Sequence, residues 1–278
     1  MPHRTAPLLA ASLAAPALAQ DAPAPDKSPY HLFNPTPREL WRPLAADRPD
    51  ATESPITVDA GAFQIEASFA ELAIEDEDGS ATTTISAAPM NLKVGLTNRV
   101  DLQLLFNPYE RVESDNAGAE RGVGDLGVRA KINLWGNDGG RTALGLLPYI
   151  VFPTGDDAVT DDAWQVGIVV PFAAELSSGW SMGTQIELAY ASPDEGDETG
   201  AFAHTITFGR DLVGALAGYV EYIGEYEFKG EAEYRPTASA GLTYTLSPDA
   251  VLDAGFRAGL DNDDTDDLVL FAGITTRF

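Results

Sequence analysis

The last eleven residues constrain the fold most, because they alternate in polarity and end on an aromatic residue. One face of this segment is largely apolar: Leu268, Leu270, Ala272, Ile274, Thr276 and Phe278. The other face carries Gly273, Thr275 and Arg277, so the period is two and the segment is predicted to be a strand. Pairing with the first strand of the chain would remove its open edge. A closed barrel with an apolar exterior is one of two structures that can cross a bilayer.

Alternating stretches of about ten residues recur from residue 61 onward, as in membrane barrels. Twelve strands are predicted near residues 62–73, 82–96, 100–110, 123–135, 142–153, 163–176, 180–191, 201–211, 215–228, 234–246, 250–260 and 267–278. Twelve is an even number, as single-chain bacterial barrels require. Alternation alone does not separate a barrel from a soluble β-sandwich, which also has one polar face.

The connections between these strands favour the barrel. Tight turns are predicted at residues 97–99, 136–141, 177–179, 211–214 and 247–249. Longer acidic connections alternate with them, at residues 75–79, 110–121, 156–162, 194–198, 229–233 and 261–267. An outer-membrane barrel has short periplasmic turns and longer outer loops. We therefore predict an all-β, closed, up-and-down antiparallel transmembrane β-barrel in the outer membrane of a Gram-negative bacterium, with periplasmic termini and the acidic loops outside the cell.

Composition excludes several other classes. No apolar run of eighteen residues follows the N-terminal segment, which excludes a transmembrane helix in the mature chain. The chain has no cysteine and therefore no disulfide or thiolate chemistry. Its net charge of -26 argues against nucleic acid as a partner, because nucleic-acid binding needs a basic surface.

The region before the barrel divides into two parts. Residues 1–19 have a short basic start, an apolar stretch and a small-x-small site, which predicts a signal peptide. Residues 20–60 are rich in proline and charge and show no regular period. This part is either a periplasmic leader or a plug inside the lumen. If it is a plug, the residues expected to need burial are Tyr30, Phe33, Leu40 and Trp41. Residues 61–278 form the predicted barrel domain.

Three motifs resemble a known family. They are residues 48–55 followed by 58–61 and 64–66, residues 122–127 leading into 129–131, and residues 148–155. Together they resemble the outer-membrane transporter family named for the meta-pathway of phenol degradation. The resemblance implies a barrel that passes small aromatic or otherwise hydrophobic molecules. The terminal Phe278 also resembles the assembly signal of bacterial outer-membrane barrels, which implies the barrel assembly machinery as a partner.

If the apolar faces meet lipid, the opposite faces line the lumen. The predicted lining acids are Glu66, Asp101, Asp125, Glu187, Glu221, Glu225 and Asp253. The predicted lining bases are Lys93, Arg129, Lys131, Arg235, Arg257 and Arg277. Such charges must pair or stay wet, because an unpaired buried ion costs several kcal/mol. They are interpreted either as ion pairs that fill the interior or as the lining of a selective pore.

No enzymatic or metal site is predicted. His204 is the single histidine of the barrel region, and Thr205-Ile206 follows it, so the His-x-Ser pair of outer-membrane phospholipases is missing. His204 is interpreted as an interfacial residue near the outer rim. The acidic segment 261–267 lacks the glycine and closing glutamate of a calcium loop. We therefore predict no catalytic residues, no cofactor and no metal ligands.

The leading hypothesis is a passive channel for a small solute. The alternative is a non-transporting structural or surface-recognition barrel in which the acidic loops are the active part, and a secreted soluble β-sandwich is the third candidate. The predicted partners are outer-membrane lipid, lipopolysaccharide and the solute.

Overall fold

The computed structural model describes residues 25–77, 80–116, 118–160, 163–193, 198–229, 231–261 and 267–278. The described chain is almost entirely β, with fifteen strands: β1 (Phe63–Glu77), β2 (Ser80–Ala87), β3 (Met90–Thr97), β4 (Val100–Phe106), β5 (Glu110–Ser114), β6 (Gly118–Gly122), β7 (Leu126–Trp135), β8 (Thr142–Phe152), β9 (Ala163–Glu175), β10 (Trp180–Pro193), β11 (Thr199–Val213), β12 (Leu216–Lys229), β13 (Glu231–Ser247), β14 (Ala250–Gly259) and β15 (Leu268–Arg277). Two short 3-10 turns, η1 (Arg38–Leu40) and η2 (Ser177–Gly179), complete it. Across these residues, no helix has the length and apolarity needed to cross a membrane.

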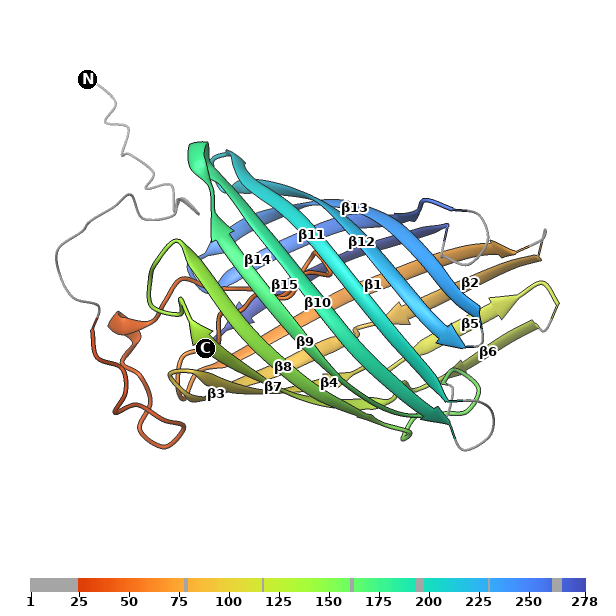
Figure 1. Ribbon diagram of the computed structural model, residues 1–278, viewed down its shortest axis with the longest axis horizontal. Helices are drawn as coiled ribbons and strands as arrows, with labels where there is room; N and C mark the ends of the chain where they lie inside the picture. Colours follow the sequence, from red (N-terminus) through yellow and green to blue (C-terminus); the bar gives the residue numbers. More distant parts are fainter. Residues whose placement is uncertain are drawn as a thin grey trace, which may run out of the picture.

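Twelve of the strands close into one antiparallel barrel (Figure 1). Around the wall they follow the order β1, β3, β4 and then β7 to β15 in sequence. The last strand pairs back to the first, from Gln64 opposite Arg277 to Ile74 opposite Leu268. Closure leaves the wall without an open edge. The predicted closed twelve-stranded barrel is therefore confirmed.

Three of the predicted strands are interrupted. β2, β5 and β6 extend the wall beyond β3, β4 and β7, and they pair with β1 and with one another. The first break lies at Ala88, which has a φ of 57°, and Pro89, which has no N–H to donate. The second break contains Pro108, and the third is held by a bond from the Gly124 N–H to the Asn107 carbonyl. The acidic connections predicted at 75–79, 110–121 and 229–233 are in large part continuations of strands, whereas most of 194–198 and 261–267 lies outside the described residues.

The two faces of the wall have opposite polarity. Buried side chains of the strands are mainly polar or charged, whereas Ile186, Leu188, Val220 and Leu270 are among the large apolar side chains exposed on the other face. A soluble sandwich would bury these apolar residues between its sheets. The wall is therefore built for an apolar exterior and a polar lumen, and the sandwich alternative is wrong.

The tight turns and the C-terminus lie at one end of the barrel, and the leader enters there (Figure 1). We use "leader" for residues 25–62. The leader is mostly irregular, and its backbone meets β3 through an isolated bridge between Ala60 and Gly95. β1 begins at Phe63, directly after the leader, so the leader continues into the first strand of the wall.

Candidate functional site

The inner face of the wall carries charge on two sides at the level where the leader lies. On one side Lys93 of β3 and Arg129 and Lys131 of β7 form what we call the basic patch. On the other side Glu221 of β12 and Asp253 of β14 form the acidic patch. In the ring of twelve strands, the strand directly opposite β3 is β11, which neighbours β12. The strand directly opposite β7 is β13, which neighbours β14. A leader in the lumen can therefore contact both patches.

Glycines on four strands make room for the leader. A Cβ atom added to Gly95 of β3 would lie 2.0 Å from the Asp59 carbonyl oxygen. Added to Gly273 of β15, it would lie 2.6 Å from an Arg48 guanidinium nitrogen. At Gly145 and Gly183 the nearest leader atoms, in residues 55 and 52, would be about 3 Å away. The wall is thus shaped to receive the leader backbone and its side chains.

Asp47 places one carboxylate at the centre of the basic patch. One carboxylate oxygen accepts a bond from Lys93, and the other accepts a bond from Lys131 with Nζ at 2.5 Å. The Asp47 N–H donates to Glu66 at 3.1 Å, which also accepts from Lys93. Burial would raise the pKa of Asp47, but Lys131, Lys93 and Arg129 outweigh that effect and hold the pKa well below its ordinary value. Asp47 is therefore ionised at neutral pH.

The next residue, Arg48, turns to the acidic patch. Arg48 donates from Nε and Nη2 to the two carboxylate oxygens of Asp253, at 3.2 and 2.8 Å, and from Nη1 to the Ser68 hydroxyl at 2.6 Å. Such a two-bond pair fixes orientation as well as charge. Adjacent residues of the leader thus pair with the two patches, and both also bond to β1.

Residues 51–53 of the leader also bond to both patches. The N–H groups of Ala51 and Thr52 donate to Glu221 at 2.9 and 2.8 Å, and the Thr52 hydroxyl donates to the same carboxylate at 2.7 Å. Glu53 returns to the basic patch, where its carboxylate accepts a bond from Arg129. We call residues 47–53 the apex of the leader.

Two carboxyl groups of the apex are held at raised pKa. Burial and the neighbouring Glu221 raise the pKa of Asp50 to about 8. Burial raises the pKa of Glu53 to about 7, although Arg129 acts in the opposite direction. At neutral pH, Asp47 is therefore the one carboxylate of the apex that is fully ionised.

The barrel end that the leader enters is also closed by ion pairs. Lys27 contacts Asp59 at 3.1 Å and Asp138 at 2.8 Å, and Arg42 contacts the same two carboxylates. Arg277 donates to the Arg42 carbonyl at 2.9 Å and to Asp249. The leader is therefore bound at its entry, at its apex and at its return to β1.

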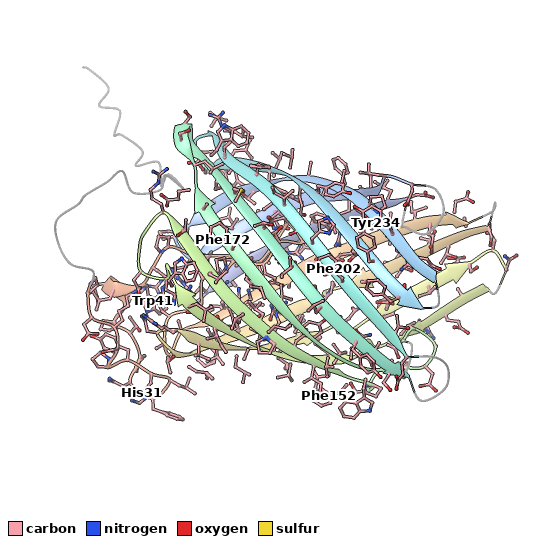
Figure 2. The ribbon with its side chains drawn as sticks, in the orientation of Figure 1. His31, Trp41, Phe152, Phe172, Phe202 and Tyr234 are labelled. Atoms are coloured by element: carbon pink, nitrogen blue, oxygen red, sulfur yellow. The ribbon has the colours of Figure 1, made fainter. Side chains whose placement is uncertain are left out.

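The four residues proposed as a plug on grounds of apolarity lie outside the apex. Phe33 is 89% exposed, and Tyr30 and Leu40 are partly exposed. Trp41 lies at the entry, with Arg38 and Arg277 each 4.9 Å from its ring centroid (Figure 2). The residues that occupy the lumen are charged ones that the sequence analysis did not single out: Asp47, Arg48 and Glu53. Because the lumen wall is polar, its partner is polar too, and the available signal was the dense charge of residues 42–59.

The remaining predicted lining residues divide by depth. Glu66, Asp101 and Arg277 are buried at the level of the leader, and Asp101 accepts the Val58 N–H at 2.9 Å. Asp125 lies between β6 and β7, where it accepts the N–H groups of Thr154 and Gly155. Beyond the apex, towards the acidic loops, lie Glu187, Glu225, Arg235 and Arg257.

Two cavities reach the apex from the acidic-loop side. The larger is about 430 Å³ and lies among β1, β2 and β12 to β15, with Glu71, Glu225, Arg235 and Arg257 in its wall. The smaller is about 270 Å³ and includes Arg129, Tyr149, Gln185 and Glu187. Ala51 lines both cavities. Ala51 of the apex therefore forms part of the floor of both cavities.

His204 lies in an aromatic cluster on β11 to β13. Its ring stacks on Phe202 at 5.8 Å between centroids, and Tyr226 lies 6.4 Å away on the next strand. Phe202 and Tyr234 of this cluster are labelled on the wall in Figure 2. In the parts of the chain that the structure describes, no group of three or more histidines and acids is arranged to hold a metal ion.

Comparisons with known proteins agree with this architecture. The sequence model of the family described as "Putative MetA-pathway of phenol degradation" matches residues 46–278. An outer membrane channel from Pseudomonas putida F1 is similar in structure, with a TM-score of 0.65 and 15% identity over 84% of this chain and all of that one. The beta domain of the Bordetella autotransporter BrkA has a TM-score of 0.53 and 16% identity over 78% of this chain and 98% of that one. No curated protein matches the chain. At these identities the two structures are similar in fold alone.

Proposed function

Because the chain belongs to the family described as the putative MetA-pathway of phenol degradation, whose model matches residues 46–278, we propose that it is an outer-membrane channel for passive passage of a small solute. The observation that carries the proposal is the pair of cavities that open from the acidic-loop side and end on the leader apex at Ala51. A barrel that served only as a wall would have no need of solvent-sized space inside it.

In this proposal the leader is the closed state of the channel. The cavities provide the outer half of the path, and the apex blocks the inner half with residues 47–53. A solute passes when the apex leaves the basic and acidic patches. The tight-turn end and both termini face the periplasm, and the strand extensions β2, β5 and β6 face the cell exterior, where acidic residues limit the approach of anions.

The test is solute flux and ion conductance of the purified mature chain in membranes. We expect sparse current steps in planar bilayers and slow, protein-dependent efflux of a small neutral sugar from liposomes. Barrels refolded from a chain that lacks residues 42–59 should conduct more, provided that they show the folded mobility of a barrel before boiling. If neither preparation passes current or solute, the chain is not a channel.

The second candidate is a non-transporting structural barrel, favoured by the number of ion pairs with which the leader fills the lumen. Ion pairs of this kind fix one arrangement of a polar interior. In that case removing the leader would lower the thermal stability of the barrel, while the intact chain would pass neither solute nor current.

A further inference from the structure

The contacts of the leader apex also indicate which solutes the lumen would accept. The apex meets the basic patch with a carboxylate, from Asp47, and the acidic patch with a cation, from Arg48. These two residues are adjacent in the chain, so one short segment presents opposite charges to the two patches. A small molecule that carries both charges would reproduce these contacts.

When the apex is set aside, bases outnumber acids on one side of the wall and acids outnumber bases on the other. Beside the three bases of the basic patch, the wall itself provides two acids, Glu66 and Asp101. Beside the two acids of the acidic patch, it provides a third acid, Glu71 of β1, and one base, Arg257, which lies 3.9 Å from Glu71. The basic side therefore has an excess of positive charge and the acidic side an excess of negative charge. The apex supplies one counter-charge to each side.

We propose that the lumen between the basic and acidic patches is a binding site for dipolar solutes with one carboxylate and one cationic group, and that the leader apex is an internal mimic of such a solute. The carboxylate binds Lys93, Arg129 and Lys131, and the cation binds Glu221 and Asp253. This inference rests on the proposed channel function and names the substrate class of the same site.

The two cavities are consistent with delivery of such a solute to this site. The smaller cavity ends on Arg129 of the basic patch, and Ala51, which lines both cavities, lies next to the bonds of Thr52 with Glu221. A solute that reaches the floor from the outside therefore meets the edge of each patch beside the apex. Its two charges can compete there with those of the leader.

The experiment measures permeation of four probes of similar size through the full mature chain in liposomes. The probes are β-alanine, which is dipolar at neutral pH, neutral propionamide, anionic propionate and cationic propylammonium. We expect β-alanine to permeate about fivefold faster than propionamide, because it forms one ion pair with each patch in the water-filled lumen. Both singly charged probes should permeate more slowly than β-alanine.

Two variants examine one side of the site each. Arg129→Gln removes a charge of the basic patch, and Glu221→Gln removes one of the acidic patch. Each should lower the β-alanine to propionamide ratio towards one. The ratio is the readout because a loosened leader would raise the flux of all probes together. Arg111→Gln, at an exposed pair with Glu113 on β5, is the matched control and should leave the ratio unchanged.

The outcomes separate this inference from the channel proposal. If all four probes permeate and propionamide or propionate is as fast as β-alanine, the dipolar site is refuted and the channel stands. If the ratio is unchanged in both variants, the site does not lie between these patches. If no probe permeates and no current is seen, both proposals fail.

Discussion

A reversible covalent link between the leader apex and the wall would test whether the leader must move. Thr52 of the apex and Thr205 of β11 have their hydroxyl oxygens 2.5 Å apart, and both side chains are buried. Replacing both by cysteine brings two sulfur atoms close to the 2.0 Å of a disulfide. The chain has no other cysteine, so the Thr52→Cys/Thr205→Cys disulfide would be the single one in the molecule.

The expected effect follows from the cost of withdrawing the apex. About thirteen hydrogen bonds join residues 47–53 to side chains of the wall. Each contributes about 1 kcal/mol net, because water replaces it in an open lumen. Release of seven ordered residues returns about 1.5 kcal/mol of conformational free energy per residue. The difference is about 3 kcal/mol, so the apex is withdrawn on the order of 1% of the time.

The assay is the current of the oxidised double variant in planar bilayers before and after addition of a reductant. Oxidation should abolish the rare current steps, because a tethered apex cannot leave the lumen. Reduction should restore them at about fivefold the native frequency, since the Thr52 hydroxyl no longer bonds Glu221. The control is a Thr82→Cys/Ser114→Cys disulfide between β2 and β5, where Cα partners face each other without contact to the leader. Its current should not depend on the reductant.

One result would refute the reasoning. If the oxidised Thr52→Cys/Thr205→Cys chain passes the same current as the reduced chain, solute and ions move around a stationary apex. The two cavities would then be parts of a continuous path, and the leader would be a fixed part of the pore lining.

Three other perturbations act on the same contacts. Asp47→Asn leaves the basic patch without its ionised partner and should weaken docking of the leader by about 3 kcal/mol, measured as new cleavage of the apex by Glu-C protease. Asp50 has a pKa of about 8 when docked and about 4 when free, and Glu53 has a pKa of about 7 when docked, so the docked state loses stability as the pH rises through this interval. Flux should rise between pH 5 and 8 and level off above, and Asp50→Asn should reduce this dependence to the part that Glu53 supplies. Gly95→Ala places a methyl group 2.0 Å from the Asp59 oxygen and should displace the leader, whereas Gly209→Ala, whose nearest contact is 3.2 Å, should not; protease protection distinguishes them.

The barrel could be predicted from the sequence because its wall repeats one rule. Each strand alternates between lipid and lumen, and a period of two is visible in a single sequence. Closure was also predictable, since the alternating segment 268–278 needs a partner and β1 provides it. The three interruptions were less visible because the alternating pattern continues across them. Pro89 and Pro108 mark two of them, since proline does not donate to a ladder.

The path of the leader could not be predicted in the same way. It has no period, and its position depends on side chains that lie far away in the sequence, such as Asp253 for Arg48. Apolarity as the criterion for burial points to Phe33 and Trp41. That criterion applies to an apolar core, whereas the interior of this barrel is polar and is filled by charge.

The leader is joined to the wall by ion pairs as well as by the continuous chain. Lys131 on β7 and Asp253 on β14 lie nearly opposite each other in the ring of twelve strands, and each pairs with the leader. A leader with Asp47 and Arg48 side by side joins them, because one side chain bonds to Lys131 and the other to Asp253. In an open lumen, water and solute must do the same. The contacts that close the barrel and the contacts that would select its solute are therefore the same contacts, and a change in either patch must alter both the docking of the leader and the preference among solutes.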